Sequence, residues 1–290
     1  MEKNEEKKMK NILLTTTAMV MTAGVAAADV SFSGAAGAGI SSTGTTNTAV
    51  WSGIDLNVSA SVTTDSGMTI SVGEDFGGGS LADWDDDYAI EDQTSDFDQP
   101  TVKIAFGSTT ISLEDGAIDD LYDDDQSGDV GISTTVGGAS VGMTLDTDAA
   151  AGAPSFSYNL AMPLGGLSLS ANGTDADGAG NAANELAASY AMGDMTLTLS
   201  TDDKGSADSI NKLKVATNVG GAAVSVSADD NDDWDLSVGY SEGSISLNVS
   251  TDENAAWETN VSVDLGGGAA FRVSATDADE FVAAGVTFSF

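Results

Sequence analysis

The sequence contains no cysteine and no histidine among its 290 residues. Without cysteine the chain can have neither disulfide bonds nor thiolate metal sites. Without histidine it lacks the usual proton shuttle and the commonest metal ligand, which disfavours most hydrolase and zinc-enzyme mechanisms. A serine with a lysine base, or a pair of carboxylates, stays formally open. We therefore expect no enzyme activity and no dedicated metal site.

Basic residues and prolines are also scarce. The chain has 9 basic against 46 acidic residues, a formal net charge of −37, and only 3 prolines. A field of this sign repels nucleic-acid phosphate and attracts cations, so we expect no nucleic-acid partner. Simple solvation of the surface would explain the charge equally well. The ordered spacing of the apolar residues argues against an acidic disordered chain.

Long apolar runs are confined to the N-terminus, where one stretch extends from Ile12 to Ala28. Lysines precede it, and Ala26 and Ala28 supply the small residues of a signal peptidase site, so residues 1–28 are predicted to be a cleaved signal peptide. Met9 would open such a signal by itself and is an alternative start. A retained helical anchor is the alternative for the segment. Since no later run could form a spanning helix, a membrane-bound mature chain must cross with strands.

Beyond residue 129 the chain repeats an alternating strand, a tight glycine turn, a second strand and an Asp-rich loop. Gly-Gly and Gly-Asp pairs between alternating runs favour hairpins, because tight turns need positive φ. In the run 244–250 the alternation places Ile245, Leu247 and Val249 on one face. The opposite face carries small neutral residues, which a wetted pore wall tolerates, although any half-buried sheet would also fit.

Extended to the whole chain, this pattern gives 18 candidate strands, and residues 29–290 are predicted to form one transmembrane antiparallel β-barrel. Short turns at one end, long acidic loops at the other and an even strand count are typical of outer-membrane barrels. Trp51, Trp234 and Trp257 each open a strand after a loop and are predicted to form an aromatic girdle, with ordinary sheet packing as the alternative. The candidate strands are 29–40, 50–63, 68–76, 100–106, 109–115, 129–136, 139–146, 155–163, 167–173, 184–192, 195–201, 211–219, 222–228, 234–242, 244–250, 257–265, 269–275 and 282–290.

The chain ends in an alternating strand whose last aromatic residues, Phe288 and Phe290, share one face. With a signal peptide and hairpins before it, this strand is typical of the assembly signal of outer-membrane barrels. The sequence resembles the porins of the purple-bacterial (Rhodobacter) group. The resemblance extends over the mature chain and is concentrated in three stretches, which are Met9 to Gly34, Thr101 to Asp125 and Val263 to Phe290.

This resemblance implies a trimer of 16-stranded barrels in the outer membrane of a Gram-negative bacterium. Its partners would be outer-membrane lipid, lipopolysaccharide and the barrel assembly machinery. A loop after the fifth strand, at about 116–128, would fold inward and narrow the pore. The implied function is general diffusion of small hydrophilic solutes and ions; a substrate-specific channel or an adhesive surface barrel is the alternative. The chain departs from the family in one respect. The family has an arginine-rich pore wall, whereas Arg272 is the single arginine here.

Charged residues supply the candidate site. Rings of carboxylates attract cations in other pores, so the acidic loop predicts cation selectivity, with a merely solvated loop as the alternative. Its oxygens could also bind Ca²⁺ weakly, but the EF-hand spacing is missing, so no cofactor is expected. Four basic residues alternate with apolar neighbours and are predicted to face the lumen, because a lysine facing lipid costs ~2–4 kcal/mol; plain solvation of the wall is the alternative role. The predicted constriction residues are Asp115, Asp119, Asp120, Asp123, Asp124 and Asp125, and the predicted basic wall is Lys103, Lys212, Lys214 and Arg272.

Overall fold

The computed structural model describes residues 28–44, 48–84, 89–93, 99–122, 126–149, 155–176, 181–205, 208–277 and 280–290. Nearly all of these residues lie in antiparallel strands, which confirms the predicted all-β class. No helix with the length and hydropathy of a membrane span occurs in these ranges. The predicted signal peptide, including Ala26, lies outside the described residues except for its last residue, Ala28.

The described part of the chain contains nineteen strands. The first nine are β1 (Asp29–Thr43), β2 (Ala49–Thr63), β3 (Thr69–Ala82), β4 (Ile90–Asp92), β5 (Thr101–Phe106), β6 (Thr109–Asp119), β7 (Ser127–Val136), β8 (Ala139–Leu145) and β9 (Phe156–Leu164). The others are β10 (Leu167–Thr174), β11 (Ala183–Met192), β12 (Met195–Asp203), β13 (Ile210–Val219), β14 (Ala222–Asp229), β15 (Trp234–Glu242), β16 (Ile245–Asp252), β17 (Trp257–Gly266), β18 (Ala269–Thr276) and β19 (Phe281–Ser289).

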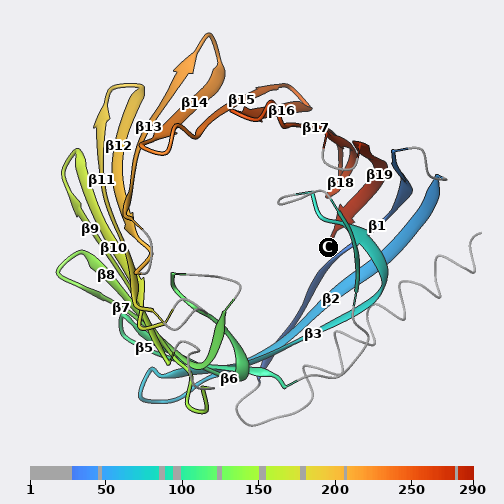
Figure 1. Ribbon diagram of the computed structural model, residues 1–290. Coiled ribbons are helices and arrows are strands. Elements are labelled where there is room, and N and C mark those ends of the chain that lie inside the picture. The colour runs from blue at the N-terminus through green and yellow to red at the C-terminus, as the bar shows by residue number, and fades with distance from the viewer. Residues whose placement is uncertain are drawn as a thin grey trace, which may run out of the picture.

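The sheet closes into a barrel because β1 pairs with both β2 and β19 (Figure 1). Within the described residues β4 pairs with β3 alone, so eighteen strands form the ring. This confirms the count made from the turns, where the family resemblance implied sixteen. Reciprocal backbone hydrogen bonds of 3.1 Å between Gly34 and Phe290 extend the seam to the C-terminus.

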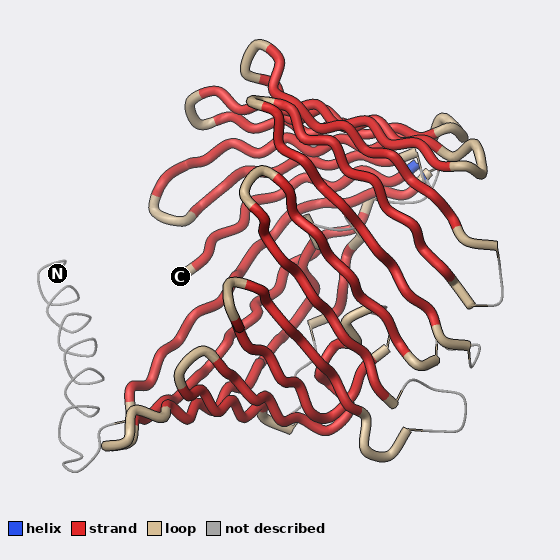
Figure 2. Tube along the Cα trace, turned by 90° about the vertical axis from the view of Figure 1, so that its left-hand side faces the viewer, coloured by secondary structure: helices blue, strands red, loops and turns tan. Residues whose placement is uncertain are grey.

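The two faces of the wall differ as the period-two pattern predicts. Ile245, Leu247 and Val249 are all exposed on the outer face, and the strand registers align such residues from strand to strand around the ring. The opposite face carries mainly Ser, Thr, Gly and Asn, so a polar interior lies inside an apolar exterior. Figure 2 shows the strands crossing the wall at a slant, with turns and loops at its two ends.

Tight turns join the strands at one end of the barrel. Gly137 and Gly138 between β7 and β8 have φ values of 60° and 89°, a conformation that glycine adopts without steric cost. The right-handed strand twist favours such turns in hairpins. The glycine pairs therefore act as the predicted hairpin signals.

The aromatic girdle is predicted correctly only in part. Trp234 and Trp257 lie on the outer face and are 39% and 43% exposed. The prediction for Trp51 is wrong, because its side chain points to the inner face and is only 3% exposed. The register pairs its outward neighbour Val50 with Ile40, which sets Trp51 on the other side of the wall.

Candidate functional site

The inner face of the barrel is the candidate site, because the polar side chains gather there. The register places several strand acids on this face, each between neighbours that point outward. The sequence did not predict a role for them, because they lie within strands and not in the acidic loop that predicted a constriction. These inner-face acids include Asp55, Asp75, Glu114, Glu185, Asp202, Asp235 and Glu258.

The four basic residues of the predicted wall lie on the same face. Lys103 is paired with Ser71 and Ser112 across the neighbouring strands, and Arg272 with Ser262 and Gly285. They do not form one cluster, because they come from β5, β13 and β18. The remaining two, Lys212 and Lys214, share β13.

Lys212 has an inner-face acid as its partner. Its Nζ lies 3.2 Å from Oδ2 of Asp235 on β15, and Ser227 on the intervening strand donates to the same oxygen at 2.8 Å. The pair is substantially exposed, so its net stabilisation is small. Part of the basic charge on this wall is therefore neutralised locally by the wall itself.

The described residues of the predicted inward loop lie along the inner face. The hydroxyl of Thr144 on β8 donates to the carbonyl of Asp119 at 2.9 Å. The backbone N–H of Leu121 donates to Ser157 Oγ on β9 at 2.9 Å. Farther along, the Tyr122 hydroxyl donates to Asp202 on β12 at 2.6 Å. The segment 116–122 thus runs across β8 and β9 toward β12, inside the ring (Figure 1).

This segment begins as a continuation of strands rather than as a free loop. A register shift between Leu113 and Ile118 marks a bulge, after which Ile118 and Asp119 still pair with β7. Bulges bend a strand and redirect its end, which is how β6 leaves the wall. Within the predicted loop, 116–128, strand pairing therefore continues to Asp119 and resumes at Ser127.

The predicted constriction acids differ in environment. Asp115 and Asp119 are exposed. Asp120 is only 7% exposed, and it accepts hydrogen bonds from the Tyr122 N–H at 2.7 Å and the Thr174 hydroxyl at 3.3 Å. Asp120 therefore holds the segment to the wall and presents little charge to solvent. The other three, Asp123, Asp124 and Asp125, lie outside the described residues.

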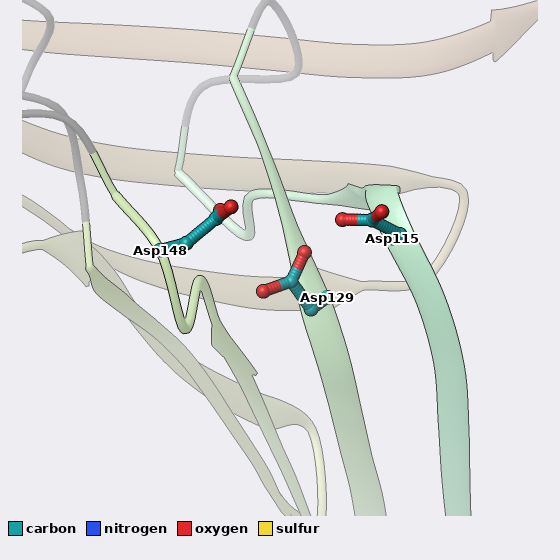
Figure 3. Close-up of side chains that lie close together, drawn as sticks. All are labelled: Asp115, Asp129 and Asp148. Atoms are coloured by element: carbon teal, nitrogen blue, oxygen red, sulfur yellow. The ribbon is translucent and has the colours of Figure 1, made fainter.

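Asp115 forms a cluster with two acids that the sequence did not single out, Asp129 and Asp148 (Figure 3). Their carboxylate oxygens lie within 4.8 Å of one another. The negative charge of Asp129 raises the pKa of the Asp148 carboxyl above its ordinary value, and the nearby Asp146 carboxylate adds to this effect. Three carboxylates could each offer one oxygen to a cation, but Ca²⁺ takes six to eight ligands.

Part of this cluster is already used in hydrogen bonds. Asp129 accepts from the Gly116 N–H at 2.9 Å and from the Thr147 N–H at 2.7 Å. Asp115 accepts from Gln99 Nε2 at 2.9 Å. These bonds tie the base of the inward segment to the neighbouring loop, which is a sufficient structural role for the acids.

A second segment on the inner face was missed in the sequence. The end of β3 and β4 pack against Trp51, and the buried cluster there consists of Trp51, Ala82, Trp84 and Ala283. Residues 77–99 were predicted to be a long acidic outer loop, and the Asp-rich composition gave no sign of an inward course. A tryptophan within an acidic loop was the one available signal.

Comparison with known proteins supplies the family context. A family model described as Gram-negative porin matches residues 15–289. Two solved structures of Rhodopseudomonas blastica porin variants share the fold: a multiply substituted variant at 15% identity and TM-score 0.52, and a triple mutant at 16% and 0.53. Both alignments cover 90% of this chain and 100% of the other. None of the curated protein sequences matches the chain.

Proposed function

The chain belongs to the Gram-negative porin family, and on that premise we propose that it is a general diffusion porin. It lies in the outer membrane and lets small hydrophilic solutes and ions pass passively. The observation that carries this proposal is the closed barrel with an apolar outer face and a polar inner face. Diffusion through such a pore needs neither catalysis nor a cofactor.

The pore is cation-selective in this proposal. Support comes from the wall as well as from the loops, because the inner-face acids outnumber the inner-face bases and one of those bases, Lys212, is paired with Asp235. An attractive potential raises the local concentration of cations and lowers that of anions. The excess of acids in the whole chain, 46 against 9 basic residues, acts in the same direction.

The segment 116–122 forms the constriction in this proposal. Its hydrogen bonds to Thr144, Ser157 and Asp202 support this role, because they hold the segment against the inner face. Among the described acids of the segment, Asp119 is exposed and Asp120 is not. We therefore assign the electrostatic role to Asp119, with Asp123, Asp124 and Asp125, and an anchoring role to Asp120.

Planar-bilayer recording tests both statements. The purified protein should conduct, and a salt gradient should give a reversal potential of the sign expected for cation preference, which weakens as salt rises because the Debye length falls from ~10 Å at 0.1 M to ~3 Å at 1 M. A protein that inserts but does not conduct would refute the porin function. Anion preference would refute the selectivity alone.

A charge-neutralised variant locates the selectivity. Changing Asp119, Asp123, Asp124 and Asp125 to asparagine should shift the reversal potential strongly toward zero. The matched control neutralises four acids in other loops, Asp208, Asp232, Asp233 and Glu253, all of which are exposed. Equal shifts in the two variants would mean that the segment contributes surface charge only and does not line the constriction.

The protein assembles as a homotrimer in this proposal. Support comes from the outer face near the seam, where small residues of β1, β2 and β3 line a depression of about 510 Å³ with Ile54, Val286 and Phe288. Ala38→Trp would fill this depression and should yield monomers in native mass spectrometry. Ala228→Trp, on the outer face of β14, is the control. Trimers of the Ala38 variant would exclude this face as the contact.

A further inference from the structure

The chain leaves the wall at Gly79. Up to this residue β3 pairs regularly with β2, and the last pair is Gly53 with Gly79. Gly79 has a φ of 75°, which few other residues adopt. The chain then passes directly over the inner face of Gly53, where an added Cβ would lie 2.7 Å from the Ser80 carbonyl oxygen. Two glycines therefore permit the turn into the lumen.

Trp51 forms the base on which the segment rests. Its ring lies on inner-face glycines of β1 and β19, because a Cβ added at Gly39 or Gly285 would be 2.4 Å or 2.3 Å from the ring. Trp84 packs edge-on against Trp51, with ring centroids 6.0 Å apart and planes at 61°. Trp84 is 8% exposed. Because Gly39 and Gly285 have no side chains, the indole pair can lie close to the wall.

The segment extends across the inner face to β17. The side-chain amide of Asn260 donates to the Trp84 carbonyl at 3.1 Å, and Ile90 of β4 and Phe281 of β19 pack against the buried cluster that contains both indoles. In Figure 1 the teal end of β3, with which β4 pairs, lies inside the ring near β1 and β19. The two inward segments therefore lie on different parts of the inner face, one against β8, β9 and β12 and the other against β2, β17 and β19.

The contact of this segment with the barrel wall is largely apolar and is centred on the buried cluster around Trp51 and Trp84. The indole N–H groups of Trp51 and Trp84 and the hydroxyl of Ser274 are buried, and they have no hydrogen-bond partner among the described residues. Buried polar groups without partners are unfavourable. The indole contact lies at the centre of the buried apolar cluster, so removing one of the two indoles should release the segment from the wall.

We propose that the second inward segment, residues 80–84 and 89–93, is a further size-determining element of the pore, held by the contact between Trp51 and Trp84. The proposal rests on the porin function proposed above. Solutes would pass between this segment and the segment 116–122, so the two together set the largest solute that enters. The acidic segment 116–122 would thus border the passage on one side, and the segment held by the tryptophan pair would border it on the other.

The test compares Trp84→Ala with Trp234→Ala, which removes a tryptophan from the outer face. In bilayers the Trp84 variant should have a higher single-channel conductance than the parent, and in liposome swelling it should admit larger sugars. The Trp234 control should match the parent. A Trp84 variant that inserts and keeps the parental conductance and size limit would overturn the proposal.

A second variant covers the case in which Trp84→Ala fails to fold. Glu91 is exposed on β4, and the chain has no cysteine, so Glu91→Cys gives one unique thiol. Labelling with a bulky maleimide should lower the conductance, whereas a label on Asp65→Cys, in a short turn, should not. Equal conductance of labelled and unlabelled Glu91→Cys would refute the proposal. A parent protein that does not conduct at all would instead refute the porin function.

Discussion

Replacing Val249 by arginine tests which face of the wall meets the bilayer. Val249 lies on the outer face of β16, paired with Val238 and Thr259, and is 39% exposed. Its neighbour Asn248 points inward and is paired with Asn260. The two positions are adjacent in sequence but differ in solvent, so they form a matched pair.

The free-energy cost of the arginine depends on how deep Val249 lies in the membrane-spanning wall. It lies four residues after Ile245, the first residue of β16. At ~3.4 Å per residue along a strand tilted by ~40°, this is about 10 Å from the short turn. An arginine near the middle of an apolar band ~25 Å tall costs ~2–4 kcal/mol. At ~1.4 kcal/mol per tenfold, the folding equilibrium in lipid falls by roughly 30-fold to 700-fold.

The assay is folding into lipid vesicles over a series of urea concentrations, followed by heat-modifiable migration on gels. Val249→Arg should move the midpoint to lower urea, and Asn248→Arg should stay near the parent because its side chain reaches water. Equal losses in the two variants would refute the assignment of faces. A loss confined to Asn248→Arg would reverse it.

Three further predictions concern the ends and the interior of the barrel. Deleting Phe290 should slow membrane insertion, measured in outer-membrane fractions; normal insertion would contradict a role in the assembly signal. Tyr122→Phe removes the hydroxyl that binds Asp202 and should increase current noise in single-channel records, whereas an unchanged trace would mean that this bond does not hold the segment. Hydrogen bonds from the side chain and backbone of Asn211 lower the pKa of Asp230, so the stability that they add is present above the ordinary pKa and is lost as pH falls through the lowered one. Amide exchange at Asn211 should therefore rise only at strongly acidic pH, and Asp230→Asn should abolish that step.

The regular part of the fold is predictable from sequence because each strand carries its own signal. In β16 the alternation of apolar and small polar residues predicts which side chains face lipid. The glycine turn before this strand predicts where the hairpin closes. These are local properties of a few residues. The number of strands in the ring follows from counting them.

The interior is less predictable because it depends on contacts between distant residues. Around Trp51 the sequence reads Val-Trp-Ser-Gly-Ile, so both faces receive an apolar residue and alternation cannot decide between them. The inward course of β4 depends on glycines at 39, 53 and 285, which meet only in the closed barrel. The cluster of Asp115, Asp129 and Asp148 likewise joins residues from separate strands and loops.

The pairing of β1 with β19 has a consequence for biogenesis. β1 cannot pair with β19 until the last strand has been synthesised. Until then the growing sheet has two unpaired edge strands, which could add strands from other molecules. Contacts between the two termini also carry the largest loop-closure entropy, which makes sealing the seam a slow step. Because β19 ends alongside the first half of β1, the chain could be joined there through a linker and reopened at another short turn. Such circular permutants would move the vulnerable edge and show whether folding must begin at the natural one.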